Sequence, residues 1–112
     1  MKKDEYIRKS VVTNVVDGDT IDAVVDLGYQ IKTEQRFRLL GINTPERGEE
    51  GYNEVKKFVT EKLLDKEVYI QSSKDDSFGR YLADVYYHDG ENQVHLNQQL
   101  LENKLAKPYK KG

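Results

Sequence analysis

The chain contains no cysteine, so it forms neither a disulfide nor a thiolate metal site. Its two histidines, His88 and His95, are too few for an imidazole-based metal cluster, and we expect both to be structural or exposed. If the protein binds a metal, that metal must therefore be a hard cation held by oxygen ligands.

No apolar run is long enough to span a membrane, and none follows the lysines at the start of the chain. We therefore expect a soluble protein without a secretory signal, which favours the cytoplasm and suits a gene carried by a phage or mobile element. A strongly basic balance is also missing, because 18 basic and 20 acidic residues give a net charge of −2. Proteins that bind nucleic acid through overall charge are clearly basic, so any phosphate contacts must come from local clusters.

The length of 112 residues predicts a single domain that buries a core without cross-links. The charged residues 1–5 and the tail 107–112 are expected to be flexible. Between them, β-branched and alternating apolar residues predict strands. The predicted strands cover residues 6–16, 20–25, 31–40, 67–71 and 80–87. Asp-Gly pairs at 17–18 and 89–90 predict hairpin turns, and 72–79 is expected to be a polar loop.

Two stretches carry the period of an amphipathic helix. In the first, Tyr52, Val55, Val59 and Leu63 fall on one face at spacings of three and four. The second runs from 96 to 105 and buries its leucines. Three strands, a helix, two strands and a helix are the element order of an OB-fold. We therefore predict an α+β fold that is mainly β: a five-stranded OB-fold barrel with one helix between the third and fourth strands and a short C-terminal helix.

The stretch from Arg38 to Glu46 ends the third predicted strand in a turn with an arginine, a side-chain amide, a proline and a carboxylate. Buried leucines before the turn would hold these polar groups on the rim of the barrel. One interpretation is an exposed ion pair between Arg38 and Glu46 beside an ordinary turn. The other is a phosphoryl-transfer site, in which an arginine grips a phosphate and a carboxylate positions water.

Three other residues allow a similar pair of interpretations. Asp19 is either part of a hairpin turn that bonds its own backbone or a cation ligand at the rim. Arg80 is either a solvated residue after a loop or a second arginine on the same phosphate. The basic tail around Tyr109 is more often a soluble tail than a surface on which a nucleotide stacks.

Together these residues resemble the staphylococcal nuclease (thermonuclease) family. Four segments carry the resemblance, in the family's order: Val16-Asp17-Gly18-Asp19-Thr20, Arg38-Leu39-Leu40-Gly41-Ile42-Asn43-Thr44-Pro45-Glu46, Phe78-Gly79-Arg80-Tyr81-Leu82-Ala83, and Leu96-Asn97 with Leu105-Ala106. The resemblance implies an OB-fold barrel and a calcium-dependent endonuclease acting on DNA and RNA. Members of the family cut between phosphorus and the 5′ oxygen and leave 3′-phosphates.

The resemblance also implies a role for each polar residue. Asp19 and the backbone carbonyl of Thr44 match calcium ligands. Arg38 and Arg80 match the two arginines that grip the phosphate. Glu46 matches the carboxylate that orients or deprotonates the attacking water.

Several departures from the family pattern matter, and two of them fall on predicted site residues. Asn43 stands where most members have a second calcium aspartate, so weaker metal binding is expected. Phe78 stands where secreted members have a tyrosine, and it keeps a ring for stacking. With Phe78 and Tyr109 as substrate contacts, we expect a monomer that acts on single-stranded or flexible nucleic acid. The alternatives are a non-catalytic OB-fold module that binds nucleic acid or protein through a site decayed at Asn43, and an interaction domain that pairs with another chain.

Overall fold

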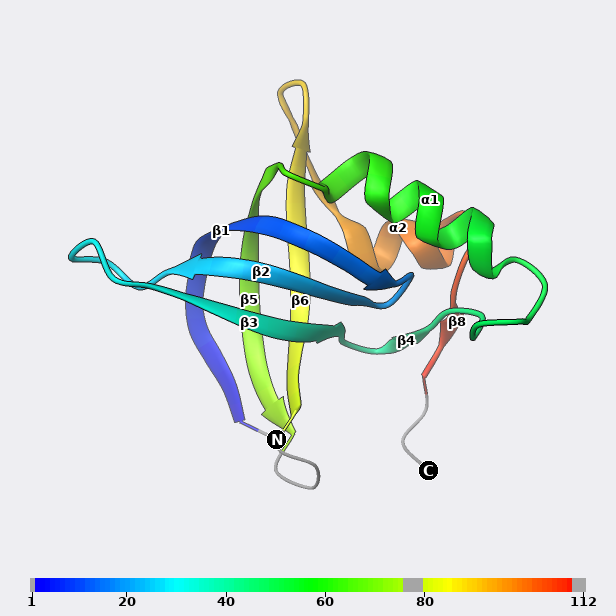
Figure 1. Cartoon of the computed structure of the whole chain (residues 1–112), viewed down its shortest axis with the longest axis horizontal. Helices are drawn as coiled ribbons and strands as arrows, with labels where there is room; N and C mark the ends of the chain where they lie inside the picture. The colour runs from blue at the N-terminus through cyan, green and yellow to red at the C-terminus, as the bar shows by residue number, and fades with distance from the viewer. Residues whose placement is uncertain (1, 76–79, 110–112) are drawn as a thin grey trace.

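Five strands wrap into a barrel (Figure 1). The computed structural model describes residues 2–75 and 80–109, with the side chains of 7–73 and 81–109. The barrel strands are β1 (Lys2–Asp17), β2 (Thr20–Asp26), β3 (Lys32–Leu39), β5 (Glu67–Asp75) and β6 (Arg80–Asp89). They pair antiparallel in the order β3-β2-β1-β5-β6, and a parallel pairing of β3 with β6 closes the barrel. The predicted five-stranded OB-fold barrel is confirmed.

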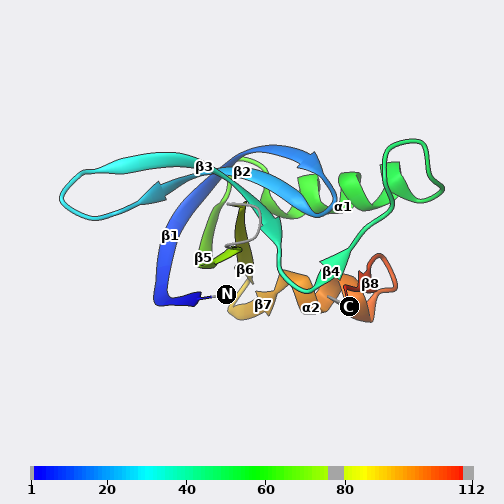
Figure 2. The same ribbon diagram turned by 90° about the horizontal axis from the view of Figure 1, so that it is seen from below.

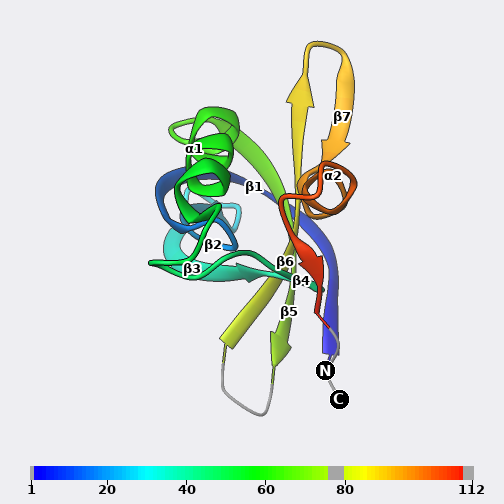
Figure 3. The same ribbon diagram turned by 90° about the vertical axis from the view of Figure 1, so that its right-hand side faces the viewer.

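Two helices cover the barrel and supply part of its core. Helix α1 (Tyr52–Leu63) buries Tyr52, Val55, Val59 and Leu63, the stripe that its sequence period predicts. Helix α2 (Leu96–Glu102) buries Leu96 and Leu100 completely. In Figure 3 the two helices lie on either side of β6. No helix in the described ranges has the length and apolar character needed to cross a bilayer.

Three short strands complete the sheets. Strand β7 (Asn92–His95) forms a hairpin with β6 after the predicted turn at residues 89–90. Strand β8 (Lys107–Pro108) pairs antiparallel with β4 (Ile42–Asn43). Figure 2 shows β8 beside β4 and the β2–β3 hairpin projecting from the opposite end of the molecule. The end of the described chain is therefore tied to the turn that follows β3.

Strand β5 is longer than its sequence pattern predicts. It continues beyond Gln71 to Asp75, so the first part of the predicted polar loop at 72–79 is strand. Backbone groups make the ladder with β6, so polar side chains do not end the strand. At the other end of the chain, β1 begins at Lys2, where its backbone pairs with β5.

Helix α2 is shorter than predicted and ends at Glu102 instead of residue 105. The reason is a left-handed turn at Lys104, whose φ is 60°. The N–H groups of Leu105 and Ala106 turn back to the carbonyl of Leu100, which satisfies an otherwise unpaired helix end. Leu105 still packs against the core from this turn.

Candidate active site

The turn between β1 and β2 carries Asp19 to the rim of the barrel. A Cβ atom on Gly18 would lie 2.5 Å from Cγ1 of Val55 and 3.1 Å from Oγ1 of Thr44. Such close approach requires glycine, because no other residue lets the backbone come this near to its neighbours. Gly18 therefore allows the turn to pack directly against α1 and the stretch after β4.

Asp19 joins two stretches that are distant in sequence. The backbone N–H of Thr44 donates to Oδ2 of Asp19 at 3.3 Å, and Nη2 of Arg38 lies 3.6 Å from the same oxygen. The backbone N–H of Leu39 donates to the Asp19 carbonyl at 2.8 Å. Only 15% of the Asp19 side chain and 19% of the Arg38 side chain are exposed, so solvent screens this ion pair weakly.

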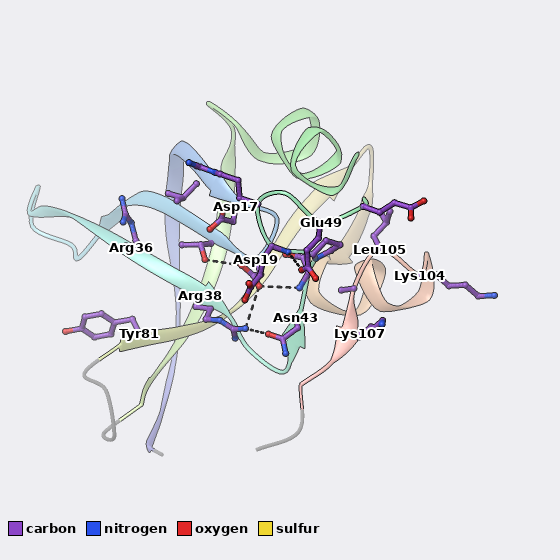
Figure 4. Close-up of a pocket in the computed structure, with 18 of the residues that line it drawn as sticks. Asp17, Asp19, Arg36, Arg38, Asn43, Glu49, Tyr81, Lys104, Leu105 and Lys107 are labelled. Carbon is purple, nitrogen blue, oxygen red and sulfur yellow. Dashed lines mark hydrogen bonds and ion pairs between the residues drawn. The ribbon is translucent and has the colours of Figure 1, made fainter. Parts of the chain in front are cut away.

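Arg38 has a second oxygen partner on the same nitrogen. Its Nη2 also donates to Oδ1 of Asn43, and Figure 4 shows the guanidinium pointing toward both Asp19 and Asn43. The ring of Tyr109 lies 5.2 Å from Cζ of Arg38, within the range of a cation–π contact. Among the described residues Arg38 makes no ion pair with Glu46, so the interpretation of a simple Arg38–Glu46 pair is wrong.

The pairing of β4 with β8 holds the next two site residues. Asn43 lies opposite Lys107, and the N–H of Tyr109 donates to the Gly41 carbonyl at 2.9 Å. Thr44 is buried, and its Oγ1 has no hydrogen-bond partner within the described part of the chain. Backbone bonds to the tail therefore hold this segment, together with the contacts of Asn43 with Arg38 and of Thr44 with Asp19.

Glu46 follows at the exposed end of this segment. Its N–H donates to Oε1 of Glu49 at 2.6 Å, and its carbonyl accepts from the N–H of Glu49 at 2.9 Å. Its own carboxylate makes no hydrogen bond or ion pair with another described residue. Arg80 begins β6, but its side chain lies outside the described residues, and so does Phe78.

Five of the predicted site residues, Asp19, Arg38, Asn43, Thr44 and Glu46, line one cleft of about 1430 Å³. The cleft residues are Val16, Asp17, Asp19, Thr20, Gln35, Arg36, Arg38, Asn43, Thr44, Pro45, Glu46, Arg47, Glu49, Glu50, Tyr81, Lys104, Leu105, Ala106 and Lys107. Arginines, lysines and carboxylates all line it, so both signs of charge are available to a substrate and a counter-ion. Figure 4 shows Arg36 and Tyr81 toward one end, and Lys104 and Lys107 toward the other.

Arg36 is held away from the Asp19 network by its own partner. Its Nε lies 2.8 Å and its Nη2 3.3 Å from the two carboxylate oxygens of Asp22. These hydrogen bonds hold the pKa of Asp22 below its usual range, although burial acts in the opposite direction. The same contact raises the pKa of Arg36. Arg36 is therefore committed to a surface pair, whereas Arg38 faces the candidate site.

The oxygen atoms at the rim are of the chemical types that bind a hard cation. The Asp19 carboxylate, the Asn43 amide oxygen and the Thr44 carbonyl are ligands that Ca²⁺ and Mg²⁺ prefer. Their charge is low, because Asp19 alone of these three is negatively charged. In the described residues no group of three or more histidine, cysteine, aspartate or glutamate side chains is placed to hold a metal ion. The set therefore suits a weakly held cation.

Several contacts around the site were not predicted. Oη of Tyr52 donates to Oδ1 of Asp17 at 2.7 Å and ties the β1–β2 turn to α1. Lys107 lines the cleft opposite Asn43, although the tail carries no pattern that would reveal it. On another face, Nε2 of His95 lies 2.9 Å from Oδ1 of Asp84, a partner that sequence spacing does not reveal.

Comparison with protein families identifies the group to which the chain is related. The model described as "Staphylococcal nuclease homologue" matches residues 36–112. The chain belongs to this family. The matched range begins after Asp19. The contacts of Asp19 with Arg38 and Thr44 join the β1–β2 turn to this range.

Three individual proteins are also similar to the chain. The chain is 30% identical to the uncharacterized protein MJ1439 of Methanocaldococcus jannaschii, over 88% of this chain and 58% of that protein. It is also 30% identical to Ribonuclease TUDOR 1 and Ribonuclease TUDOR 2 of Arabidopsis thaliana. Those matches cover 88% and 89% of this chain but 10% and 11% of the two ribonucleases. The chain therefore spans little more than half of the first relative and about a tenth of the others.

Proposed function

We propose that this member of the family is a calcium-dependent endonuclease that hydrolyses phosphodiester bonds of DNA and RNA. By the family resemblance, it cuts between phosphorus and the 5′ oxygen and leaves 3′-phosphates. One observation carries the proposal: Asp19, from the β1–β2 turn, shares one contact network on a charged cleft with Arg38 and Asn43, from the stretch that ends at Glu46. Two relatives that bear the name ribonuclease support the same class of substrate bond.

The proposed calcium ligands are the Asp19 carboxylate, the Asn43 amide oxygen and the Thr44 carbonyl. Calcium, when bound, would neutralise negative charge on the phosphate. The buried setting of Thr44 and its N–H bond to Asp19 support a rigid ligand set. Pre-positioned ligands need no ordering when the substrate arrives.

Arg38 is proposed to bind the scissile phosphate. Its planar guanidinium can donate two parallel hydrogen bonds to the non-bridging oxygens, a geometry that lysine lacks. These bonds strengthen as charge builds on the equatorial oxygens during displacement. Arg80 is assigned the same role by its position in the family motif.

Glu46 is proposed to act on the attacking water. Its carboxylate is exposed, lines the cleft and is unpaired among the described residues, so it is free to accept a hydrogen bond from water. It would hold that water in line with the bond to the 5′ oxygen and take its proton as the new bond to phosphorus forms. The 5′ oxygen then leaves and takes a proton from solvent.

Substrate bases are proposed to contact Phe78 and Tyr109. The ring of Tyr109 is 45% exposed, which leaves surface for stacking while it also packs against Arg38. Stacking on aromatic rings favours single-stranded or flexible strands over a stiff duplex, and we propose that a monomer makes all of these contacts.

One observation favours a second candidate function. Asn43 removes a negative charge from the ligand set, and Arg38 already donates to its amide oxygen. A site that no longer binds a cation would leave a non-catalytic module that binds nucleic acid, or a protein through the barrel surface.

Digestion of heat-denatured DNA with and without calcium separates the two candidates. We expect cleavage that requires calcium, stops with chelator and is lost in Glu46→Gln. Glu50→Gln is the matched control, because Glu50 lies on the same loop and the same cleft but has no proposed role. It should cleave like the parent protein. Binding of the DNA without cleavage in Ca²⁺, Mg²⁺ and Mn²⁺ would establish the module instead.

A further inference from the structure

One nitrogen atom of Arg38 faces two of the three proposed calcium ligands. Nη2 donates a hydrogen bond to Oδ1 of Asn43 and lies 3.6 Å from Oδ2 of Asp19. A positive charge therefore already sits against the oxygens that a calcium ion would use. Arg36, two residues earlier on β3, makes no such contact, because its guanidinium is paired with Asp22.

A guanidinium in this position opposes the binding of a calcium ion to the same oxygens. Calcium needs its oxygen ligands at about 2.3–2.6 Å, with their lone pairs directed at the ion. In the observed arrangement Oδ1 of Asn43 accepts an N–H group of Arg38, and Oδ2 of Asp19 forms an ion pair with the same nitrogen at 3.6 Å. Both species are cations, and the small exposed fractions of Asp19 and Arg38 leave little water to screen their repulsion. The neutral Asn43 adds no charge that would offset it.

We propose that Arg38 is a tethered competitor for the cation site, so that calcium binding displaces its guanidinium from Asp19 and Asn43 and frees it for the phosphate. This inference rests on the proposed function for the identity of the cation and of the phosphate. The Arg38 side chain would then have two positions. Without metal it contacts Asp19 and Asn43, and with metal it faces the phosphate of the substrate.

The rest of the structure allows this exchange without a change of fold. The backbone of Arg38 is paired on both sides, with Thr20 of β2 and with Leu82 of β6, so only the side chain needs to move. The ring of Tyr109, 5.2 Å from Cζ, supports the guanidinium in the metal-free position. Tyr109 is itself held by its N–H bond to the Gly41 carbonyl.

The exchange couples the two ligands of the site. A phosphate that binds the released guanidinium opposes its return to Asp19 and Asn43, so phosphate tightens calcium binding. By linkage, calcium tightens phosphate binding by the same factor. Calcium alone and phosphate alone should therefore each bind more weakly than either does in the presence of the other.

Calcium titration calorimetry on the intact chain tests the competition directly. Arg38→Gln should bind calcium roughly 10- to 100-fold more tightly than the parent protein, within the usual range of coupling between two ligands. Arg36→Gln is the matched control, since it removes the same charge from the same strand and the same cleft. It should change the affinity by less than about threefold, the effect of screened charge alone.

A second measurement follows Arg38 in the unaltered protein. The side-chain Nε–Hε signal of Arg38 in nuclear magnetic resonance spectra should shift with calcium and reach half of its full change at the calorimetric dissociation constant, while that of Arg36 stays in place. If Arg38→Gln does not fold, Arg38→Met carries the same calorimetric test.

Equal or weaker calcium binding in the Arg38 variant, a gain no larger than that of Arg36→Gln, or no binding in any variant would overturn the competition. Neither measurement uses cleavage. If the protein digests DNA but Arg38→Gln binds calcium no more tightly, the nuclease proposal stands and the competition proposal is wrong. If Arg38→Gln binds calcium more tightly but the protein digests no DNA, the competition proposal stands and the nuclease proposal is wrong.

Discussion

Nδ2 of Asn97, on α2, lies 2.9 Å from the carbonyl oxygen of Leu40, at the end of the strand that carries Arg38. The same amide group donates to the Ala83 carbonyl at 3.0 Å, and its Oδ1 accepts the N–H of Val85 at 3.1 Å. One buried side chain therefore joins α2, β6 and the start of the site turn.

Asn97→Ala should destabilise the protein by about 2–4 kcal/mol, because it takes from the Leu40 carbonyl and the Val85 N–H the partner that Asn97 supplies. Denaturant unfolding measures the loss. Gln98→Ala, on the exposed face of the same helix, should stay within about 0.5 kcal/mol of the parent. A small effect at Asn97 would mean that water replaces its hydrogen bonds.

Gly18→Ala should destabilise by about 1–3 kcal/mol, because the new methyl group collides with Cγ1 of Val55. Val55→Ala removes that atom and leaves a cavity of its own. The double variant should therefore lose at least about 1 kcal/mol less than the sum of the two single losses. Additive losses in unfolding experiments would contradict a direct contact between the two residues.

Asn43→Asp should tighten calcium binding by roughly tenfold, or about 1.4 kcal/mol, because it restores a negative charge to the ligand set. Calorimetric titration gives the two dissociation constants. Asn53→Asp adds the same charge on the exposed face of α1 and should leave the affinity unchanged. Equal affinities for Asn43→Asp and the parent protein would mean that Asn43 is not a calcium ligand.

The Asp22–Arg36 pair should contribute to stability only above acid pH. Since Arg36 lowers the pKa of Asp22 in the folded state, the contribution is present above the unfolded value of about 4 and disappears as pH falls through the folded value. Arg36→Gln should therefore lower the melting temperature slightly at pH 7 and not at pH 2. Lys32→Gln, an exposed change on the same strand, controls for loss of charge. A difference that persists at pH 2 would mean that packing, not charge, supplies the effect.

Local periodicity was enough to predict the elements that build the core. Tyr52, Val55, Val59 and Leu63 are buried because a helix brings every third and fourth residue to one face. The ends of elements were less predictable. The left-handed Lys104 that ends α2 has no glycine to announce it, and the extension of β5 depends on a partner strand.

The sequence predicted which residues line the site better than it predicted which of them contact one another. Asp19, Arg38, Asn43, Thr44 and Glu46 do line one cleft, and the rim arrangement follows from strands that end together. The sequence could not show that Arg38 pairs with Asn43 rather than Glu46, because that choice depends on side-chain geometry. Nor could it show Lys107 opposite Asn43, since a two-residue strand has no period to detect.

The pairing of Lys107 with Asn43 has a practical consequence for anyone who purifies this protein. A polyhistidine tag fused after residue 112 would start only a few positions after Lys107, whereas the described residues that line the cleft include no histidine. Titrations on such a fusion would report the metals captured by the tag. Cleavable tags, removed before any calcium measurement, keep the oxygen ligands as the only ones under study.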